Sequence, residues 1–363
     1  MATEWQVVAV LANLALSKTV GCSAIALVPQ SDPRVQAECK LHPKLSEFLS
    51  KFTDEFGEKI SPPVVIISEQ LHNGKISSEA IAGFRDAIAL SVIPRSRSRQ
   101  LLGSPALCPS YSDAFAIYPW SLDFEFKGLV TNTPAVLRPH GVEPFQGQSA
   151  PALGPNSVTD SNIDTPLRDT LLDRWQTRFL HNNPQWEDLA LFRSLNMANQ
   201  ACLMPAGPEM TTYDVGRSIA LWVSAFEILA HPGANGKSNK NVVCELLGRT
   251  PWLTNSRESK PKTERACEIY KRIDNARNKF LHGNEITDET LSFRGTDHNL
   301  FRLAAPLYRM ALTSFLSLQF QAPAPSKDDT TALGIEMSDS VEFKSNQKIY
   351  EKALFPDPDN GSP

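Results

Sequence analysis

Three stretches in the C-terminal half of the chain repeat apolar residues at alternating spacings of four and three, and this pattern limits the fold most. The spacing places every repeated residue on one face of an α-helix. Long helices that each carry one apolar face bury those faces by packing together. The sequence therefore predicts a helical bundle over residues 167–320, with repeats at Val215, Ile219, Trp222, Phe226 and Leu229, at Ala266, Ile269, Ile273, Ala276 and Phe280, and at Phe301, Ala305, Tyr308, Leu312 and Phe315.

The preceding residues alternate between strand-like and helix-like segments. "WQVVAVLANLAL", "CSAIALVP", "PPVVIIS" and "DAFAIYPWSLDFEF" favour strands, whereas "KLSEFLSKFTDEFG" and "SSEAIAGFRDAIALSVI" have helical spacing. We therefore predict an α+β protein, in which a mixed α/β domain over residues 1–140 precedes an antiparallel helical bundle. Residues 141–166, rich in Gly, Pro, Ser and Asn, are predicted to be a linker or long loop. Residues 321–363 are predicted to be a polar flexible tail, with one short helix near residues 347–353.

Bulk properties restrict the class of protein. A chain of 363 residues suits two domains of ordinary size. A formal net charge of −4 argues against a protein that coats nucleic acid, so any such contact should be a local site. The six cysteines show no C-x-x-C spacing, so we expect no zinc site and no disulfide framework, but reduced thiols in a cytoplasmic protein: Cys22, Cys39, Cys108, Cys202, Cys244 and Cys267.

One N-terminal segment needs a separate explanation. Residues 7–28 are largely apolar and about as long as a membrane span. Polar residues interrupt them, and Glu4 precedes them where a signal peptide would carry positive charge. Two strands joined through residues 17–21 fit the pattern better, so we expect neither a membrane segment nor a secretory signal.

The segment "RIDNARNKFLHG" places Arg277, Asn278 and His282 at the end of a helix, because Gly283 is the residue expected just past a helix C-terminus. Asn278 and His282 are four residues apart and share a helix face. Arg277 lies roughly 140° away from His282 on an ideal helix. Arg277 and His282 therefore converge only if the helix ends or unwinds near residues 281–283, or if sites from two chains combine.

These residues and their context resemble the HEPN superfamily, and in particular its ApeA-like branch. In that family the motif is an Arg, a polar residue, a short apolar run and a His, as in "ARNKFLHG". The helix "LWVSAFEIL" supports the resemblance, with Glu227 where such domains often carry an acidic residue. The resemblance covers residues 212–320. It implies a HEPN-like bundle, a homodimer with one composite active site on the two-fold axis, and a toxin or phage-defence effector with a regulatory protein partner.

The activity that the resemblance implies is metal-independent cleavage of RNA. The 2′-hydroxyl must lose a proton and the 5′-oxygen leaving group must gain one, and a histidine can transfer either proton. A guanidinium fork suits the charge on the transition-state oxygens. We therefore predict an endoribonuclease without metal or cofactor, with His282 as general acid or base, Arg277 on the phosphate, Asn278 positioning either group, and Glu227 in a supporting role.

Each of these residues also has a structural interpretation. Arg277 could pair with Asp274 three residues earlier, and His282 could cap the C-terminus of its helix. Glu227 could pair with Arg217 or with a neighbouring helix, rather than orient Arg277. The bundle would then be a non-catalytic RNA-binding or dimerisation module, or a scaffold for a protein partner.

Three further features are assigned no function. Arg174 and His181 have a similar spacing, but we interpret them as a solvated helix face that runs into a loop. "GANGKS" at residues 233–238 lacks the first glycine of a P-loop, since His231 stands there, and it follows a helix rather than a strand. The basic residues between positions 257 and 272 alternate with glutamates, which favours a solvated helix, although they could steer RNA phosphates toward the motif.

Overall fold

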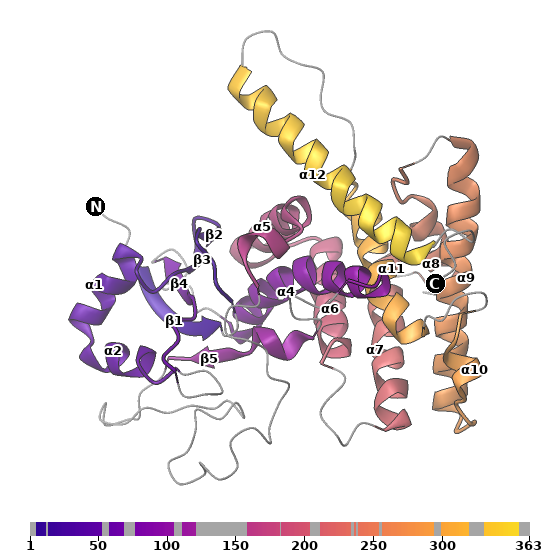
Figure 1. Cartoon of the computed structure of the whole chain (residues 1–363), viewed down its shortest axis with the longest axis horizontal. Helices are drawn as coiled ribbons and strands as arrows, with labels where there is room; N and C mark the ends of the chain where they lie inside the picture. The colour runs from indigo at the N-terminus through magenta and orange to yellow at the C-terminus, as the bar shows by residue number, and fades with distance from the viewer. Residues whose placement is uncertain are drawn as a thin grey trace.

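The computed structural model describes residues 5–11, 14–52, 58–68, 77–104, 111–120, 158–181, 183–203, 211–233, 236, 239–253, 256–293, 299–318 and 330–355. The described chain is α+β, as the sequence predicts. A small antiparallel sheet at one end adjoins many helices, which fill the rest of the molecule (Figure 1).

The N-terminal part of the chain forms a five-stranded sheet with the order β2-β3-β4-β1-β5, in which every pairing is antiparallel. Strands β1 and β4 pair from Trp5 opposite Ser68 to Val10 opposite Val64. The apolar runs predicted to be strands contain four of these five strands. The strands are β1 (Trp5–Leu11), β2 (Val20–Gly21), β3 (Ile25–Val28), β4 (Val64–Ser68) and β5 (Ile117–Pro119).

Both faces of the sheet are buried, which explains why its strands appear in the sequence as nearly continuous apolar runs. One face packs against the short helices α1 (Pro33–Leu41) and α2 (Pro43–Leu49), around Phe48. The opposite face faces the remaining helices and joins the main hydrophobic core through Ala9, Leu11, Ile25, Leu27, Val65 and Ile67.

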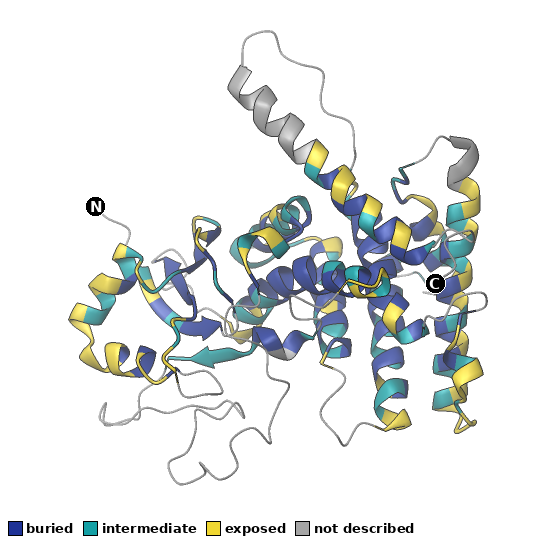
Figure 2. Cartoon of the chain, in the orientation of Figure 1, coloured by how far each residue is buried: buried dark blue, intermediate teal, exposed yellow. Residues whose placement is uncertain are grey.

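Helix α4 (Ser78–Leu101) joins the sheet to the other helices. It lies in the middle of the molecule and is largely buried (Figures 1 and 2). Trp175 donates a hydrogen bond from Nε1 to the carbonyl oxygen of Ala80 on α4, at 2.8 Å. One hydrophobic core runs from the sheet through α4 to the later helices. The predicted boundary at residue 140 therefore does not separate two hydrophobic cores. The partners of α4 are α5 (Thr165–Leu180), α6 (Trp186–Ala201), α11 (Leu300–Phe315) and α12 (Thr330–Leu354).

The helices with apolar stripes pack against one another. Helices α6 and α7 (Thr212–Ala230) are antiparallel, because Ser194 near the middle of α6 bonds the Ala225 carbonyl and Ser218 on α7 bonds the Ala201 carbonyl. The predicted stripes are mostly buried, which confirms the helix faces expected from spacing. Beside them lie α8 (Lys240–Gly248), α9 (Ser256–Leu281) and α10 (Asp288–Leu291).

The predicted flexible tail is wrong for residues 330–354, although the short helix expected near residues 347–353 is present. Residues 330–354 form α12, and its second half packs against α4, α5 and α11. Tyr350 is fully buried there, and Asn346 and Gln347 are buried although they are polar. The predicted linker also ends earlier than expected, since Val158 forms a bridge with Leu14 and α5 begins at Thr165. Residues 121–157 and 356–363 lie outside the described residues.

The prediction that all cysteines are reduced is also wrong. Cys244 on α8 and Cys267 on α9 form a disulfide with a Cα–Cα distance of 5.2 Å, whereas reduced thiols were expected. Cys22, Cys39 and Cys202 are free, and Cys108 lies outside the described residues. Sequence spacing did not predict this disulfide, because the packing of α8 on α9 brings together two thiols that are 23 positions apart in the chain.

Reduction of this disulfide is expected to lower the free energy of unfolding by about 3 kcal/mol, because the bond closes a loop of 23 positions in the unfolded chain. Urea denaturation with and without dithiothreitol measures the loss. A variant with Cys244→Ser and Cys267→Ser should unfold at the urea concentration of the reduced wild type, and dithiothreitol should not change its midpoint. Equal midpoints for the wild type in both conditions would show that the bond does not stabilise the fold.

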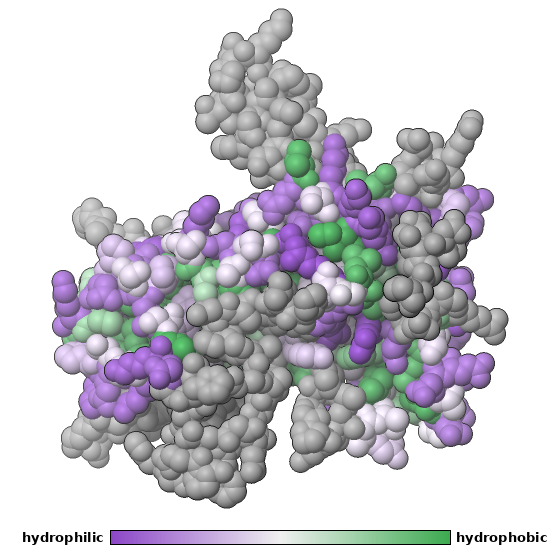
Figure 3. Space-filling model, in the orientation of Figure 1, coloured by the Kyte–Doolittle hydropathy of each residue, from purple (hydrophilic) through white to green (hydrophobic). Residues whose placement is uncertain are grey.

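The described surface carries mainly polar side chains. Hydrophilic residues cover much of the face shown in Figure 3, with hydrophobic ones scattered between them. No helix within the described residues combines the length and the apolar character that crossing a bilayer requires.

Candidate functional site

Helix α9 ends where the sequence predicts. The N–H of Gly283 bonds the carbonyl of Phe280 at 3.1 Å, and the N–H of Asn284 bonds that of Lys279 at 3.0 Å. Gly283 has a φ of +70°, which an L side chain would oppose. These bonds define a Schellman motif, in which His282 occupies the C-cap position. His282 is therefore the residue at which the helix stops, and its side chain is exposed.

Arg277 points from α9 toward α7. Its Nη2 donates to Glu227 Oε1 at 3.1 Å and to Asp274 Oδ1 at 3.0 Å. Asn278 donates from Nδ2 to the other oxygen of Asp274 at 3.4 Å. Asp274 thus holds both Arg277 and Asn278, while Glu227 reaches them from the facing helix. Sequence spacing suggested the Asp274 contact as one alternative, and the contact with Glu227 needed the position of α7.

The approach of α7 to α9 depends on one glycine. A Cβ atom at Gly216 would lie 2.1 Å from Cδ2 of Phe280, so only glycine lets the two helices come this close without moving the Phe280 ring. Farther along the helices, the rings of Phe226 and Tyr270 pack at a centroid distance of 5.2 Å. The two contacts show that α7 and α9 are antiparallel, which places the start of α7 beside the helix end that carries His282.

Burial shapes the electrostatics of this site. Removal from water raises the pKa of Glu227, an effect that nearby Asp274 increases and Arg277 opposes. Burial also raises the pKa of Tyr270 far above its usual range, and Glu227 adds to that shift. The Tyr270 hydroxyl and the Arg277 Nε atom are shielded from solvent, and neither has a hydrogen-bond partner among the described residues. Two carboxylates face one guanidinium, so the described site carries a formal excess of negative charge.

The raised pKa of Glu227 predicts a pH dependence of stability. The folded chain holds the Glu227 proton more tightly than the unfolded chain does, so the stabilisation is fully present below about pH 4.5 and is lost as pH rises through the folded pKa. The free energy of unfolding of the wild type, relative to Glu227→Gln, should therefore be higher below pH 4.5 than at neutral pH. Urea denaturation at both pH values measures it. Glu245→Gln, at an exposed position on α8, is the control for the loss of a carboxyl group. If the wild type shows the same pH trend relative to Glu245→Gln, the trend does not come from Glu227.

Within the described chain, no hydrogen bond or ion pair joins Arg277 to His282. Arg277 is turned toward α7, and His282 lies at the exposed helix end. The helix does end near residues 281–283, as the convergence of Arg277 and His282 would require. Within one chain, however, no hydrogen bond brings the two side chains together. Both structural interpretations are also present, since Arg277 pairs with Asp274 and His282 occupies a C-cap.

The other sequence features stay outside this site. Arg174 pairs with Asp188 at 2.7 Å, and exposed His181 caps α5. His231 caps α7 and accepts a hydrogen bond from the N–H of Gly233, at the start of "GANGKS". Among the described residues, no group of three or more His, Cys, Asp or Glu side chains gathers as metal ligands would.

Comparisons with family models, with curated proteins and with solved structures find no match to this chain. The resemblance to HEPN domains therefore depends on the residues quoted above.

Proposed function

We propose that this chain is a metal-independent endoribonuclease of HEPN type. The observation that carries the proposal is the grouping of Arg277, Asn278 and Glu227 between α7 and α9, next to a helix end that exposes His282. This grouping offers a guanidinium for a phosphate and an imidazole for proton transfer. We propose RNA as the partner and the cytoplasm as the place of the activity.

In the proposed reaction the 2′-oxygen loses its proton and attacks the adjacent phosphorus. The bond from phosphorus to the 5′-oxygen breaks, and that oxygen receives a proton. His282 transfers one or both protons, and the products carry a 2′,3′-cyclic phosphate and a 5′-hydroxyl. Arg277 stabilises the negative charge on the non-bridging oxygens. To do so, its guanidinium must release one of its two carboxylate partners, Glu227 or Asp274, and bind the phosphate instead.

We further propose that two chains form a homodimer with a composite site, which would supply the contact between Arg277 and His282 that one chain lacks. The start of α7 and the end of α9 support this idea, because they lie together and expose apolar side chains. Tyr213 is 75% exposed and Leu281 is 58% exposed. Exposed apolar side chains that gather in one place are typical of protein contacts.

The test is incubation of the purified chain with total RNA in EDTA, followed by analysis of the new ends. The proposal expects cyclic phosphate and 5′-hydroxyl ends from the wild type and none from Arg277→Ala. Arg168→Ala, which removes an arginine from an ion pair with the exposed Asp169, should cleave as the wild type does. A toxin or defence effector should also slow cell growth when expressed, through Arg277. Equal RNA patterns with wild type and Arg277→Ala, whatever regulatory partner is added, would argue against an enzyme.

The alternative is a non-catalytic HEPN module for RNA binding or dimerisation. The two carboxylates on Arg277 favour this alternative, because they satisfy the guanidinium that a substrate phosphate would need. It predicts the same fold and dimer, without cleavage that depends on His282.

A further inference from the structure

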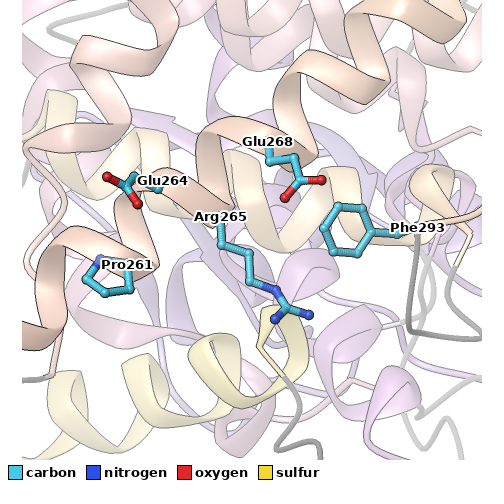
Figure 4. A pocket seen from close by; sticks show the side chains of 5 residues that line it. All are labelled: Pro261, Glu264, Arg265, Glu268 and Phe293. Atoms are coloured by element: carbon cyan, nitrogen blue, oxygen red, sulfur yellow. The ribbon is translucent and has the colours of Figure 1, made fainter.

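A pocket of about 340 Å³ lies on α9, away from the candidate site. It is open to solvent on one side, and in Figure 4 the side chain of Arg265 extends between Pro261 and Phe293. Arg265 and Arg277 are twelve positions apart on α9, which is about 18 Å along a helix axis. The pocket is therefore a separate feature. Its lining residues are Pro261, Glu264, Arg265, Glu268 and Phe293.

Arg265 is the cationic side chain of the lining, and no ion pair with a carboxylate of the described residues involves it. Its guanidinium lies over the ring of Phe293, with Cζ 5.6 Å from the ring centroid. Its Nε atom is shielded from solvent and has no hydrogen-bond partner in the part of the chain that the structure describes. A buried donor without an acceptor is unfavourable, by roughly 1–3 kcal/mol in general. A ligand with acceptor oxygens would remove this deficit.

The two glutamates of the pocket are matched by other cations. Glu264 lies 4.0 Å from Lys260, and Glu268 lies 3.5 Å from Arg272. The lining itself holds these two carboxylates and the guanidinium of Arg265, whereas Lys260 and Arg272 lie outside it. Because both glutamates pair with those cations, Arg265 is the lining group that can bind an anion.

The Phe293 ring under the guanidinium of Arg265 is itself fixed. Arg272 lies over the same Phe293 ring at 5.3 Å and donates to the carbonyl of Ser292 at 3.4 Å. Phe293 itself is only 3% exposed, so the ring that supports Arg265 is fixed by its surroundings. A planar fork that is already oriented loses less entropy when it binds an oxyanion.

We propose that this pocket binds a phosphate group through Arg265. The phosphate can belong to a small molecule or to the backbone of RNA, and both sources present the same tetrahedral oxyanion to the guanidinium. The site does not require catalysis at His282. If RNA is the source, the pocket extends the path of the proposed substrate by about 18 Å from Arg277.

The test uses the full chain, titrated with inorganic phosphate and with an oligoribonucleotide that has hydroxyl groups at both ends, at constant ionic strength. Calorimetry measures the first affinity and fluorescence anisotropy the second. Arg265→Gln should weaken binding of the phosphate source at least about tenfold. The matched control is Lys271→Gln, which removes a positive charge from an exposed position of the same helix and should change affinity less than about twofold.

The result identifies the source of the phosphate. Loss of inorganic phosphate binding in Arg265→Gln supports a small-molecule site. Loss of oligoribonucleotide binding supports an RNA contact, and the slope of log affinity against log salt concentration should then be smaller by about one in the variant. If Arg265→Gln does not fold, as judged by circular dichroism, Arg265→Lys replaces it and should weaken binding because it lacks the fork. Saturable binding of neither probe to the wild type, or equal losses in the Arg265 and Lys271 variants, would overturn the proposal. Binding of inorganic phosphate needs no cleavage of RNA, so this arm of the test stands or falls separately from the proposed activity.

Discussion

RNA cleavage in EDTA is expected to fall roughly 100- to 10,000-fold when His282 is replaced by alanine. His282 is exposed at the end of α9, and a histidine side chain can act as a general acid or base. The change should leave stability nearly unaltered, because the Schellman bonds at this helix end come from the backbone of Gly283 and Asn284. Initial rates on a labelled RNA measure the effect, with thermal melting as the check on folding.

The structure offers a matched control for this variant. His181 is also exposed and also occupies the C-cap position of a helix, so His181→Ala removes the same group from an equivalent place on α5. Cleavage by His181→Ala should match that of the wild type. If both histidine variants cleave equally well, His282 is only a cap, and the non-catalytic alternative for the bundle becomes the better explanation.

The helical part was predictable because its evidence is periodic. Trp222 and Phe226 recur at helical spacing and are fully buried, as are Ile273 and Tyr308. Apolar periodicity reports which face of a helix is buried, and it does so without knowledge of the partner. Gly283 was equally informative, since its positive φ and the bonds around it are local properties of a helix end.

The contacts of the site were only partly predictable, because they depend on neighbouring helices. Asp274 lies three residues before Arg277, so sequence spacing suggests that pair. The direction of the Arg277 side chain depends on Glu227, fifty positions earlier, and on the closeness that Gly216 permits. Composition also gave no signal for the disulfide between Cys244 and Cys267, whose pairing follows from the packing of α8 on α9.

The error at the C-terminus has a clear physical cause. A polar segment ordinarily lacks enough apolar surface to pack, which is why a flexible tail was expected. In α12, however, polar residues contact the core together with the buried Phe343, Ala353 and Leu354. Asn346 donates to Asp164 at 3.1 Å, Tyr350 donates to the same carboxylate at 3.2 Å, and Gln347 bonds Arg309. Hydropathy does not reveal these buried polar contacts around the ion pair of Asp164 and Arg309.

That ion pair yields the largest expected change in stability. Asp164 and Arg309 are both fully buried, with Nε and Nη2 each 3.1 Å from Oδ2. Asp164→Ala leaves the Arg309 charge buried without a counterion, so the free energy of unfolding should fall by roughly 3–5 kcal/mol. Urea denaturation followed by circular dichroism measures the loss. Asp169→Ala, which breaks an exposed ion pair with Arg168 on the same helix, should cost less than about 1 kcal/mol.

A double variant separates the loss of charge pairing from the loss of packing. In Asp164→Leu with Arg309→Met both charges are gone, so no buried charge lacks a counterion, and part of the stability lost in Asp164→Ala should return. The return is incomplete because Asn346, Gln347 and Tyr350 each lose a hydrogen-bond partner. The two side chains also order Asn346 and Tyr350, so proteolysis should cut within α12 more readily in Asp164→Ala than in the wild type. An Asp164→Ala midpoint equal to that of Asp169→Ala would mean that Arg309 is solvated in solution and that α12 docks without the ion pair.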